Sequence, residues 1–159
     1  MPRPTMKSKN KPCLPAAVKL LAARDYSEAE LRARLARQGH PEAAVDAAVG
    51  ELRRRGYLDD EKLGRHLLAR YLADGQHGRL GIGQRLEKRG LTSSLVAALL
   101  TEQGVAGEYE RAAAAAATRF PVGTAVDPAK LGRFLAARGF VDEVVLSVLC
   151  RCYGYEDNG

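Results

Sequence analysis

Hydrophobic residues recur along the chain in one spacing that appears three times. In the first copy Leu31 and Leu35 precede Gly39 by eight and four positions, and Val45 and Val49 follow it by six and ten. The other two copies have the same spacing around Gly90 (Ile82, Leu86, Val96, Leu100) and around Gly139 (Leu131, Leu135, Val145, Leu149). Apolar residues four positions apart share one face of a helix, and glycine readily adopts the left-handed conformation that ends a helix. The pattern therefore predicts a helix, a glycine turn and a second helix in each copy.

One further helix is expected before each of these helix pairs. Helical patterns run over residues 16–24, 60–73 and 108–120, so the sequence predicts nine helices and an all-α fold. Repeats of this size bury little surface alone, and we expect them to stack into an elongated, curved array. The expected segments are three tandem three-helix repeats at residues 15–57, 58–104 and 105–153, a basic disordered tail at 1–14, and a short tail at 154–159.

Capping residues mark where several of these helices begin. Ser27 and Glu30 have the spacing of a capping box, in which each side chain accepts a hydrogen bond from the backbone N–H of the other residue. Pro41 suits the first turn of a helix. Asp127 followed by Pro128 is typical of an N-cap with proline at the first helical position.

A glycine-rich segment at residues 75–83 is expected to be the least regular part of the repeats, and loops are expected at 104–107 and 121–124. The glycines of this segment do not match a nucleotide-binding loop. No strand pattern precedes them, their order is not G-x-G-x-x-G, and no Lys-Ser or Lys-Thr pair follows.

The sequence offers no recognisable catalytic or metal site. Asp59 and Asp60 are adjacent, so their side chains would diverge by about 100° on a helix, and we expect an N-cap and a first-turn charge there. The three cysteines form no C-x-x-C pair, and the three histidines lack the spacing of metal ligands on a helix. We therefore expect a protein that is not an enzyme and that holds no cofactor and no metal.

Charge is distributed unevenly along the chain. Residues 1–90 carry 19 Lys or Arg against 11 Asp or Glu, a formal charge of +8, whereas residues 91–159 carry 6 against 8, a charge of −2. Clustered Lys and Arg favour a polyanion such as nucleic acid, and the competing interpretation is a solvated face kept basic for solubility. No stretch approaches the roughly 20 apolar residues of a membrane-spanning helix, and no apolar core follows the basic start, so we expect a cytoplasmic protein with no membrane partner.

A helix-turn-helix that reads DNA sequence is another interpretation of the glycine turns. Its second helix would place side chains such as Arg, Lys, Asn or Gln against base edges. Here the second helices begin Pro41-Glu42, Thr92-Ser93 and Val141-Asp142, which are small or acidic, so sequence-specific reading is not expected. Aromatic residues make up 6% of the chain and do not interleave with the arginines, so base stacking on single strands is not indicated either.

Basic residues instead gather on the helix before each glycine turn and at the end of the first repeat. Together they would form one basic band along the first two repeats, suited to phosphates or to an acidic protein surface. The candidate residues for contact with a partner or with DNA are Arg32, Arg34, Arg37, Arg53, Arg54, Lys62, Arg65, Arg70, Arg79, Arg85, Lys88 and Arg89.

Four segments carry the motifs of a known regulatory family. They are Arg24-Asp25-Tyr26-Ser27-Glu28-Ala29-Glu30-Leu31, Arg55-Gly56-Tyr57-Leu58-Asp59-Asp60-Glu61, residues 82–86 followed by Lys88-Arg89-Gly90-Leu91, and Arg133-Phe134-Leu135-Ala136-Ala137-Arg138-Gly139-Phe140. In the order and spacing of these segments, the chain from about residue 16 to residue 151 resembles the RecX regulators of bacterial RecA.

The resemblance implies three tandem three-helix repeats and a cytoplasmic protein that lies along the groove of the RecA filament. It also implies restraint of recombination, and of the ATPase and coprotease activities of RecA, in DNA repair and the SOS response. The implied partners are the RecA filament and single- and double-stranded DNA bound without sequence preference, and we expect a monomer. The alternative is a non-specific basic helical DNA-binding protein without a recombinase partner.

The central loop departs from the family pattern. Family members usually carry Gly-Pro and an arginine just before the isoleucine, whereas this chain has Gly78-Arg79-Leu80-Gly81 before Ile82. A phosphate or RecA contact of this loop would therefore have moved to Arg79 or been lost. Since the third repeat carries few cations, we expect the first two repeats to dominate any DNA contact and the third to meet protein.

Overall fold

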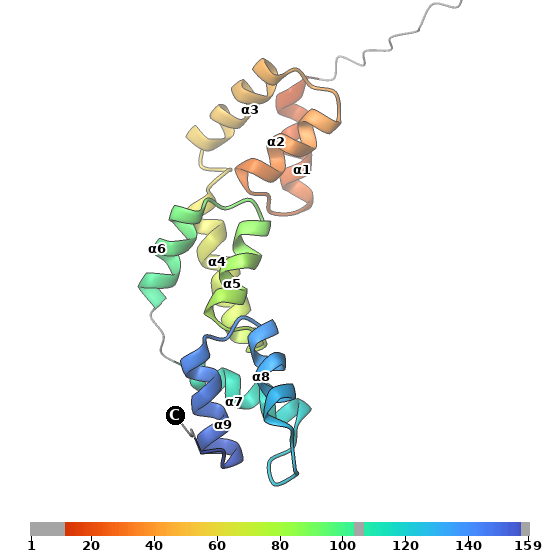
Figure 1. The fold of residues 1–159 in the computed structure, drawn as a ribbon. Helices are drawn as coiled ribbons and strands as arrows, with labels where there is room; N and C mark the ends of the chain where they lie inside the picture. The colour runs from red at the N-terminus through yellow and green to blue at the C-terminus, as the bar shows by residue number, and fades with distance from the viewer. Residues whose placement is uncertain (1–11, 104–106, 157–159) are drawn as a thin grey trace, which may run out of the picture. The chain divides into compact units, whose positions relative to one another are not determined.

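The computed structural model describes residues 12–103 and 107–156, and all regular structure within them is helical (Figure 1). The nine helices of these residues are α1 (Cys13–Ala23), α2 (Glu28–Arg37), α3 (Glu42–Arg54), α4 (Asp60–Asp74), α5 (Arg79–Lys88), α6 (Ser93–Gln103), α7 (Glu108–Arg119), α8 (Pro128–Ala137) and α9 (Asp142–Tyr153). The predicted all-α repeat fold is confirmed. None of the described helices is both long enough and apolar enough to span a membrane.

The chain divides into two compact units, residues 1–60 and residues 61–159. Unit 1 contains one cluster of buried side chains, contributed by α1, α2 and α3. Unit 2 contains two such clusters, one from α4, α5 and α6 and one from α7, α8 and α9. We call these three-helix groups repeat 1, repeat 2 and repeat 3.

The apolar positions of the repeated sequence pattern form these cores. Six of them have no exposed surface, two in the middle helix of each repeat: Leu31, Leu35, Ile82, Leu86, Leu131 and Leu135. Burying one such side chain contributes about 1.5–3 kcal/mol. In repeat 3 the alanine run of α7 includes three buried residues, Ala112, Ala115 and Ala116, which let α7 pack closely on α8 and α9.

The predicted glycine turns are present in all three repeats. Gly39, Gly90 and Gly139 have φ angles of 89°, 84° and 79°, in the left-handed region that side chains disfavour. Each turn closes in the same way, because the N–H of the residue after the glycine donates to a carbonyl inside the preceding helix. These bonds are 3.2 Å from His40 to Leu35, 3.4 Å from Leu91 to Leu86 and 3.2 Å from Phe140 to Leu135.

The predicted caps are mostly confirmed. Ser27 and Glu30 form a capping box at the start of α2, with both hydrogen bonds at 3.1 Å. The carboxylate of Asp127 accepts a hydrogen bond of 3.0 Å from the N–H of Ala129, and Pro128 is the first residue of α8. Pro41 differs by one position, since it precedes α3 as the N-cap residue and does not lie in the first turn.

Two predicted boundaries are wrong by a few residues. The helix expected from residue 16 begins at Cys13, so the end of the expected basic tail belongs to α1, and residues 1–11 of that tail lie outside the described residues. The irregular segment expected at 75–83 ends at Gly78, because α5 begins at Arg79 and includes the last two glycines. A helix can continue through glycine when packing against a neighbour stabilises it.

The expected loops and the expected C-terminal tail are described in part. Residues 121–124 form an irregular connection between α7 and α8, as predicted, whereas 104–106 of the other loop lie outside the described residues. Of the expected tail, Tyr155 packs on repeat 3, because its hydroxyl donates a hydrogen bond to the carbonyl of Val126. Residues 157–159 lie outside the described residues.

Candidate nucleic-acid and partner interface

Repeats 2 and 3 meet backbone against backbone inside unit 2, where the segment before α5 lies against the turn between α8 and α9 (Figure 1). The N–H of Gly78 donates to the carbonyl of Arg138, and the N–H of Leu80 donates to the carbonyl of Gly139, both at 3.0 Å. A Cβ atom on Gly81 would collide with the carbonyl oxygen of Arg138, and one on Gly139 would collide with the backbone of Gly81. We call residues 76–81 and 138–140, which form this contact, the seam. Glycine is therefore required on both sides of the seam.

The first residue of α7 fixes the start of α5 at the seam. Glu108 is 1% exposed, and its Oε1 accepts a hydrogen bond of 3.0 Å from the backbone N–H of Arg79, the first residue of α5. A carboxylate is stabilised at this end of a helix by the unpaired N–H groups and the helix dipole. Arg79, which follows Gly78 in the loop that departs from the family pattern, is thus held by its backbone, and its side chain is half-buried.

Cationic side chains gather beside the seam. The guanidinium of Arg138 donates from Nη1 to the backbone carbonyl of Gln76 at 3.3 Å and to its Oε1 at 3.4 Å, and it lies 4.4 Å from the ring centre of Phe134. On the repeat 2 side, the guanidinium of Arg85 lies 5.8 Å from the ring centre of Tyr71. The guanidinium of Arg138 therefore packs on an aromatic ring, which limits its freedom, whereas that of Arg85 lies at the outer limit of a cation–π contact.

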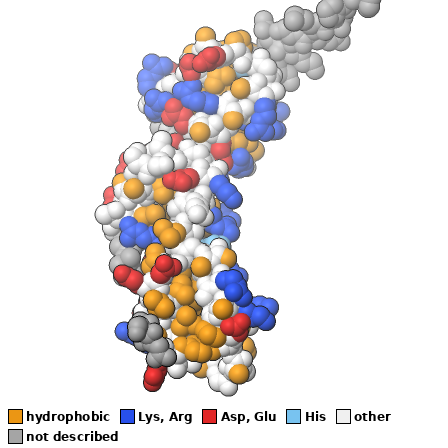
Figure 2. Space-filling view, in the orientation of Figure 1, with side chains coloured by type: hydrophobic (Ala, Val, Ile, Leu, Met, Phe, Trp, Pro, Cys, Tyr) orange, Lys and Arg blue, Asp and Glu red, His pale blue; other side chains and the backbone are white. Residues whose placement is uncertain are grey.

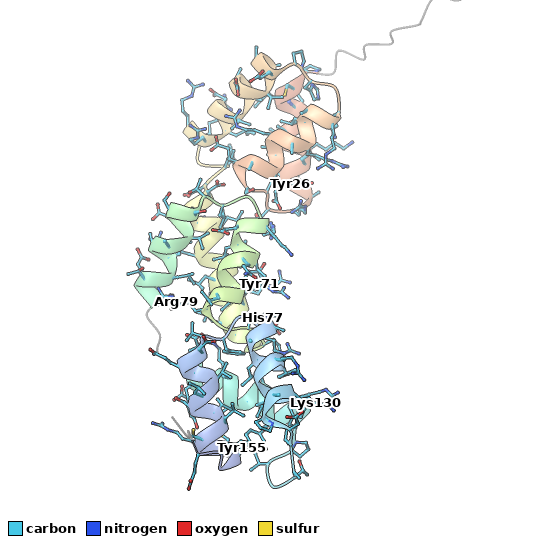
Figure 3. All side chains as sticks on the ribbon, viewed as in Figure 1. Tyr26, Tyr71, His77, Arg79, Lys130 and Tyr155 are labelled. Atoms are coloured by element: carbon cyan, nitrogen blue, oxygen red, sulfur yellow. The ribbon has the colours of Figure 1, made fainter. Side chains whose placement is uncertain are left out.

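His77 lies in the seam between Gln76 and Gly78, and the positive charges of Arg85 and Arg138 act on its imidazole ring. Its Nδ1 is buried and has no hydrogen-bond partner. Burial lowers the pKa of His77, and the positive charges of Arg85 and Arg138 lower it further, against a smaller opposing effect of Asp74. Figure 2 shows blue basic side chains gathered beside a pale-blue histidine in the middle of the view, where Figure 3 labels His77. We call His77, Arg85 and Arg138 the seam cluster.

In unit 1 most of the predicted contact residues are bound to carboxylates. These ion pairs join Arg32 with Glu28 and with Asp46, Arg53 with Glu28, and Arg54 with Glu51. By contrast, Arg34 and Arg37 on α2 are exposed and form no ion pair within the described residues. Exposed ion pairs contribute about 0–1 kcal/mol each, so the paired arginines remain able to change partners, but their charge is offset locally.

In unit 2 the other predicted residues lie on α4, on α5 and just after α5. Arg65 pairs with Glu61 at 2.6 Å and approaches Glu102 at 3.5 Å. Three residues are exposed and form no ion pair within the described part of unit 2: Arg70, Arg85 and Lys88. Lys62 is exposed, and Arg79 and Arg89 are half-buried. The predicted set thus includes arginines that pair with carboxylates, namely Arg32, Arg53, Arg54 and Arg65. It also includes five exposed cations that form no ion pair within the described residues, namely Arg34, Arg37, Arg70, Arg85 and Lys88.

Sequence reasoning missed His77 and Arg138 as members of this cluster. Both are brought to it by the close approach of two backbone segments that lie about sixty residues apart in the chain. The available signal was glycine at positions 78, 81 and 139, because glycine marks places where backbones approach closely.

Asp60 is the first residue of α4, as expected for a first-turn charge, but its carboxylate also caps a different helix. Its Oδ1 accepts a hydrogen bond of 2.8 Å from the backbone N–H of Glu28, the first residue of α2. Burial raises the pKa of Asp60, and the bond from Glu28 acts in the opposite direction. Asp60 is therefore explained as a structural cap.

The cysteines of the described residues are reduced, and two of them have defined surroundings. Cys13 is buried, which raises the pKa of its thiol, and the Sγ of Cys152 lies 3.3 Å from the hydroxyl of Tyr109. Within residues 12–103 and 107–156, no group of three or more His, Cys, Asp and Glu side chains is arranged to hold a metal ion.

Comparison with known proteins identifies the family. A model of the first three-helix domain of RecX matches residues 13–52. The chain is 33% identical over 140 residues to the regulatory protein RecX of Chromohalobacter salexigens, covering 86% of this chain and 90% of that protein. It is 35% identical over 146 residues to the RecX of Leptothrix cholodnii, covering 84% of each chain. The crystal structure of RecX from Lactobacillus salivarius has the same fold, with a TM-score of 0.78 at 15% identity over 89% of this chain and 94% of that one. The chain therefore belongs to the RecX family of regulatory proteins.

Proposed function

We propose that this protein binds the RecA recombinase and its DNA filament, and that it modulates, mainly by inhibition, the recombinase, ATPase and coprotease activities of RecA. It acts in the cytoplasm, as a monomer, during DNA repair and the SOS response. It works by binding and catalyses no reaction itself. Family membership supports the choice of RecA as partner.

The observation that carries the DNA part of this proposal is a set of exposed cations without carboxylate partners. Among the predicted contact residues this set is Arg34, Arg37, Arg70, Arg85 and Lys88. Side chains of this kind release counterions when they meet phosphates and so supply affinity for any nucleic-acid sequence. The other proposed contact residues are Arg32, Arg53, Arg54, Lys62, Arg65, Arg79 and Arg89.

The helices after the glycine turns do not supply sequence reading. The helices α3, α6 and α9 begin at Glu42, Ser93 and Asp142, so their N-terminal residues are small or acidic. Carboxylates at these positions would be repelled by phosphates flanking a groove. The binding mode supported by these features is contact with backbone phosphates and with protein.

The test is the DNA-dependent ATP hydrolysis of RecA on single-stranded DNA, titrated with this protein, beside a binding curve on naked DNA in the same buffer. We expect inhibition well below the concentration that coats naked DNA. Unchanged ATP hydrolysis at saturating protein would refute the proposal. Inhibition that appears only when the DNA is coated would favour a basic helical DNA-binding protein without a recombinase partner.

A further inference from the structure

We propose that the seam cluster is a phosphate-binding site, built jointly by repeats 2 and 3, that holds a backbone phosphodiester of single-stranded DNA. The inference deepens the proposed function and rests on it for the identity of the ligand. It gives the third repeat a direct DNA contact, whereas the sequence predicted that the first two repeats dominate DNA contact and that the third meets protein.

The first step is that Arg138 is held in place before any ligand arrives. Its backbone carbonyl accepts from Gly78, and its side chain donates to Gln76, so Arg138 bonds the residues on both sides of His77. The ring of Phe134 supports the guanidinium at 4.4 Å. Only Nη1 of this guanidinium is used within the described residues, and the remaining N–H groups can donate to an anion. A donor that is already ordered loses little freedom on binding.

The second step is that no carboxylate forms an ion pair with the two arginines of the cluster, unlike several of the predicted contact residues. Arg32, Arg53, Arg54 and Arg65 each pair with a carboxylate, but Arg85 and Arg138 form no ion pair within the described residues. The charge of Asp74 raises the pKa of His77, but this effect is smaller than the lowering caused by either arginine. Arg138 is hydrogen-bonded beside His77, and Arg85 is close enough for its charge to act on the same ring. Two guanidiniums around one histidine without an ion-paired carboxylate are suited to an anion, and guanidinium matches phosphate oxygens in geometry.

The third step concerns His77. A buried ring nitrogen without a partner is uncommon and often marks a place where a water or an ion binds. The repulsion between a protonated His77 and the two arginines falls when an anion lies among them. A bound phosphate would therefore favour protonation of His77, so the protonation of this ring would report whether the site holds an anion.

A strand of phosphates fits the surroundings better than a single acidic side chain. Arg85 and Lys88 are three positions apart on α5, so they are neighbours on one face of that helix, and both are exposed. A strand whose phosphate lies in the seam cluster would place a neighbouring phosphate within reach of Lys88. An acidic side chain of a protein would use the cluster alone.

The experiment measures how salt weakens binding of the full chain to a fluorescent oligothymidylate. The variant is Arg85→Gln with Arg138→Gln, and the matched control is Lys130→Gln with Arg133→Gln, which removes the same charge from exposed positions of α8. Figure 3 labels Lys130 well away from His77. Each lost contact with a single strand lowers the slope of log K against log salt by about 0.7, so two lower it by about 1.4, or roughly 25-fold in affinity at 0.1 M salt.

Two further variants guard against loss of folding. Arg85→Gln alone removes an exposed side chain and should lower the slope by about 0.7, or roughly 5-fold in affinity at 0.1 M salt. Arg138→Lys keeps the charge and should keep the slope close to that of the natural chain. Circular dichroism and thermal unfolding of every variant show whether helicity is preserved.

Each outcome decides the inference separately from the proposed function. A loss of slope in the seam variants that the control does not share supports the phosphate site. An equal loss in the control attributes binding to net charge and overturns it. Unchanged DNA binding with lost inhibition of RecA assigns the cluster to an acidic protein surface, which overturns the phosphate site and leaves the proposed function standing. If the natural chain leaves RecA unaffected, the proposed function fails, and the salt slopes still decide whether the cluster binds phosphate.

Discussion

The carboxylate of Asp60 caps the helix that begins at Glu28, through a hydrogen bond of 2.8 Å from the Glu28 N–H. Glu108 caps the helix that begins at Arg79 in the same way, at 3.0 Å. In both cases the acceptor is the first residue of α4 or α7, which opens a repeat, and the donor is the first residue of the middle helix of the preceding repeat. A long-range cap is therefore a repeated feature of this fold.

Replacing Asp60 tests the first of these caps. Asp60→Ala leaves the Glu28 N–H without its partner and should lower the free energy of unfolding by about 1–2 kcal/mol. Asp60→Asn keeps an oxygen acceptor and should cost much less. Urea unfolding followed by circular dichroism measures both, and equal losses for the two variants would show that the bond contributes nothing.

The same pair predicts a dependence on pH. Burial raises the pKa of Asp60, so the folded state favours the protonated carboxyl. That contribution is fully present below the unfolded pKa of about 3.9, and it is lost as pH rises through the folded pKa. The stability of Asp60→Asn relative to the natural chain should therefore increase from about pH 3 to pH 6. A constant difference over this range would argue against burial as the cause.

Two glycine substitutions separate backbone strain from close packing at the seam. Gly39 and Gly139 both have positive φ, but a Cβ on Gly39 meets no atom within 4 Å, whereas a Cβ on Gly139 would collide with Gly81. Gly39→Ala should cost about 1–2 kcal/mol from strain alone, and Gly139→Ala about 3 kcal/mol or more. Equilibrium unfolding of the two variants gives the comparison. Similar costs would mean that the two backbones at the seam separate easily.

His77 should titrate below its ordinary range in the free protein. Burial lowers its pKa first, and the charges of Arg85 and Arg138 add to this. Arg138→Gln should therefore raise the pKa of His77, which NMR can follow through the imidazole C–H signal. An unchanged pKa in this variant would show that Arg138 does not act on the ring.

This shift also affects stability. A histidine whose pKa is lowered by folding supports the folded state above its unfolded pKa of about 6.5, and that support is lost as pH falls through the folded value. The natural chain should lose stability on acidification more steeply than His77→Gln. Thermal unfolding between about pH 7 and pH 5 measures the difference, and parallel curves would contradict the expectation.

Arginines that carry equal charge should differ in their effect on DNA binding. Arg34→Gln with Arg37→Gln removes two exposed cations without ion pairs, and Arg53→Gln with Arg54→Gln removes two that pair with Glu28 and Glu51. We expect the first variant to weaken binding to an oligonucleotide several-fold more than the second, because the paired arginines must give up a carboxylate first. Equal losses would mean that net charge alone governs binding.

The sequence predicted the elements of this fold well because the signals are local. The spacing around Gly39, Gly90 and Gly139 depends on helix geometry and on one turn conformation, so it could be recognised without knowledge of tertiary structure. The capping box of Ser27 and Glu30 is equally local. The shift of Pro41 by one position is within the uncertainty of any helix end.

The candidate site was predicted only in part because its decisive contacts are not local. The sequence predicts Arg85 as a cation on a helix, but no residue near it in the sequence indicates Arg138. Arg138 lies close to this segment because its carbonyl accepts a hydrogen bond from the N–H of Gly78. The ion pairs Glu28–Arg32 and Glu61–Arg65 follow the four-residue spacing of helices, whereas the bond between Arg53 and Glu28 joins two different helices. Charge counting alone therefore could not separate the offset arginines from the others.

Pro128 occupies, in repeat 3, the position of Glu28 and Arg79, and proline has no backbone N–H to donate. The start of α8 is completed by the adjacent Asp127 instead. If a further repeat were added after α9 by design, the carboxylate on its first residue would find no backbone N–H at Pro128 to accept from. Extension would first require replacing Pro128 with a residue that has an amide hydrogen, so a single imino acid limits how modular this scaffold is.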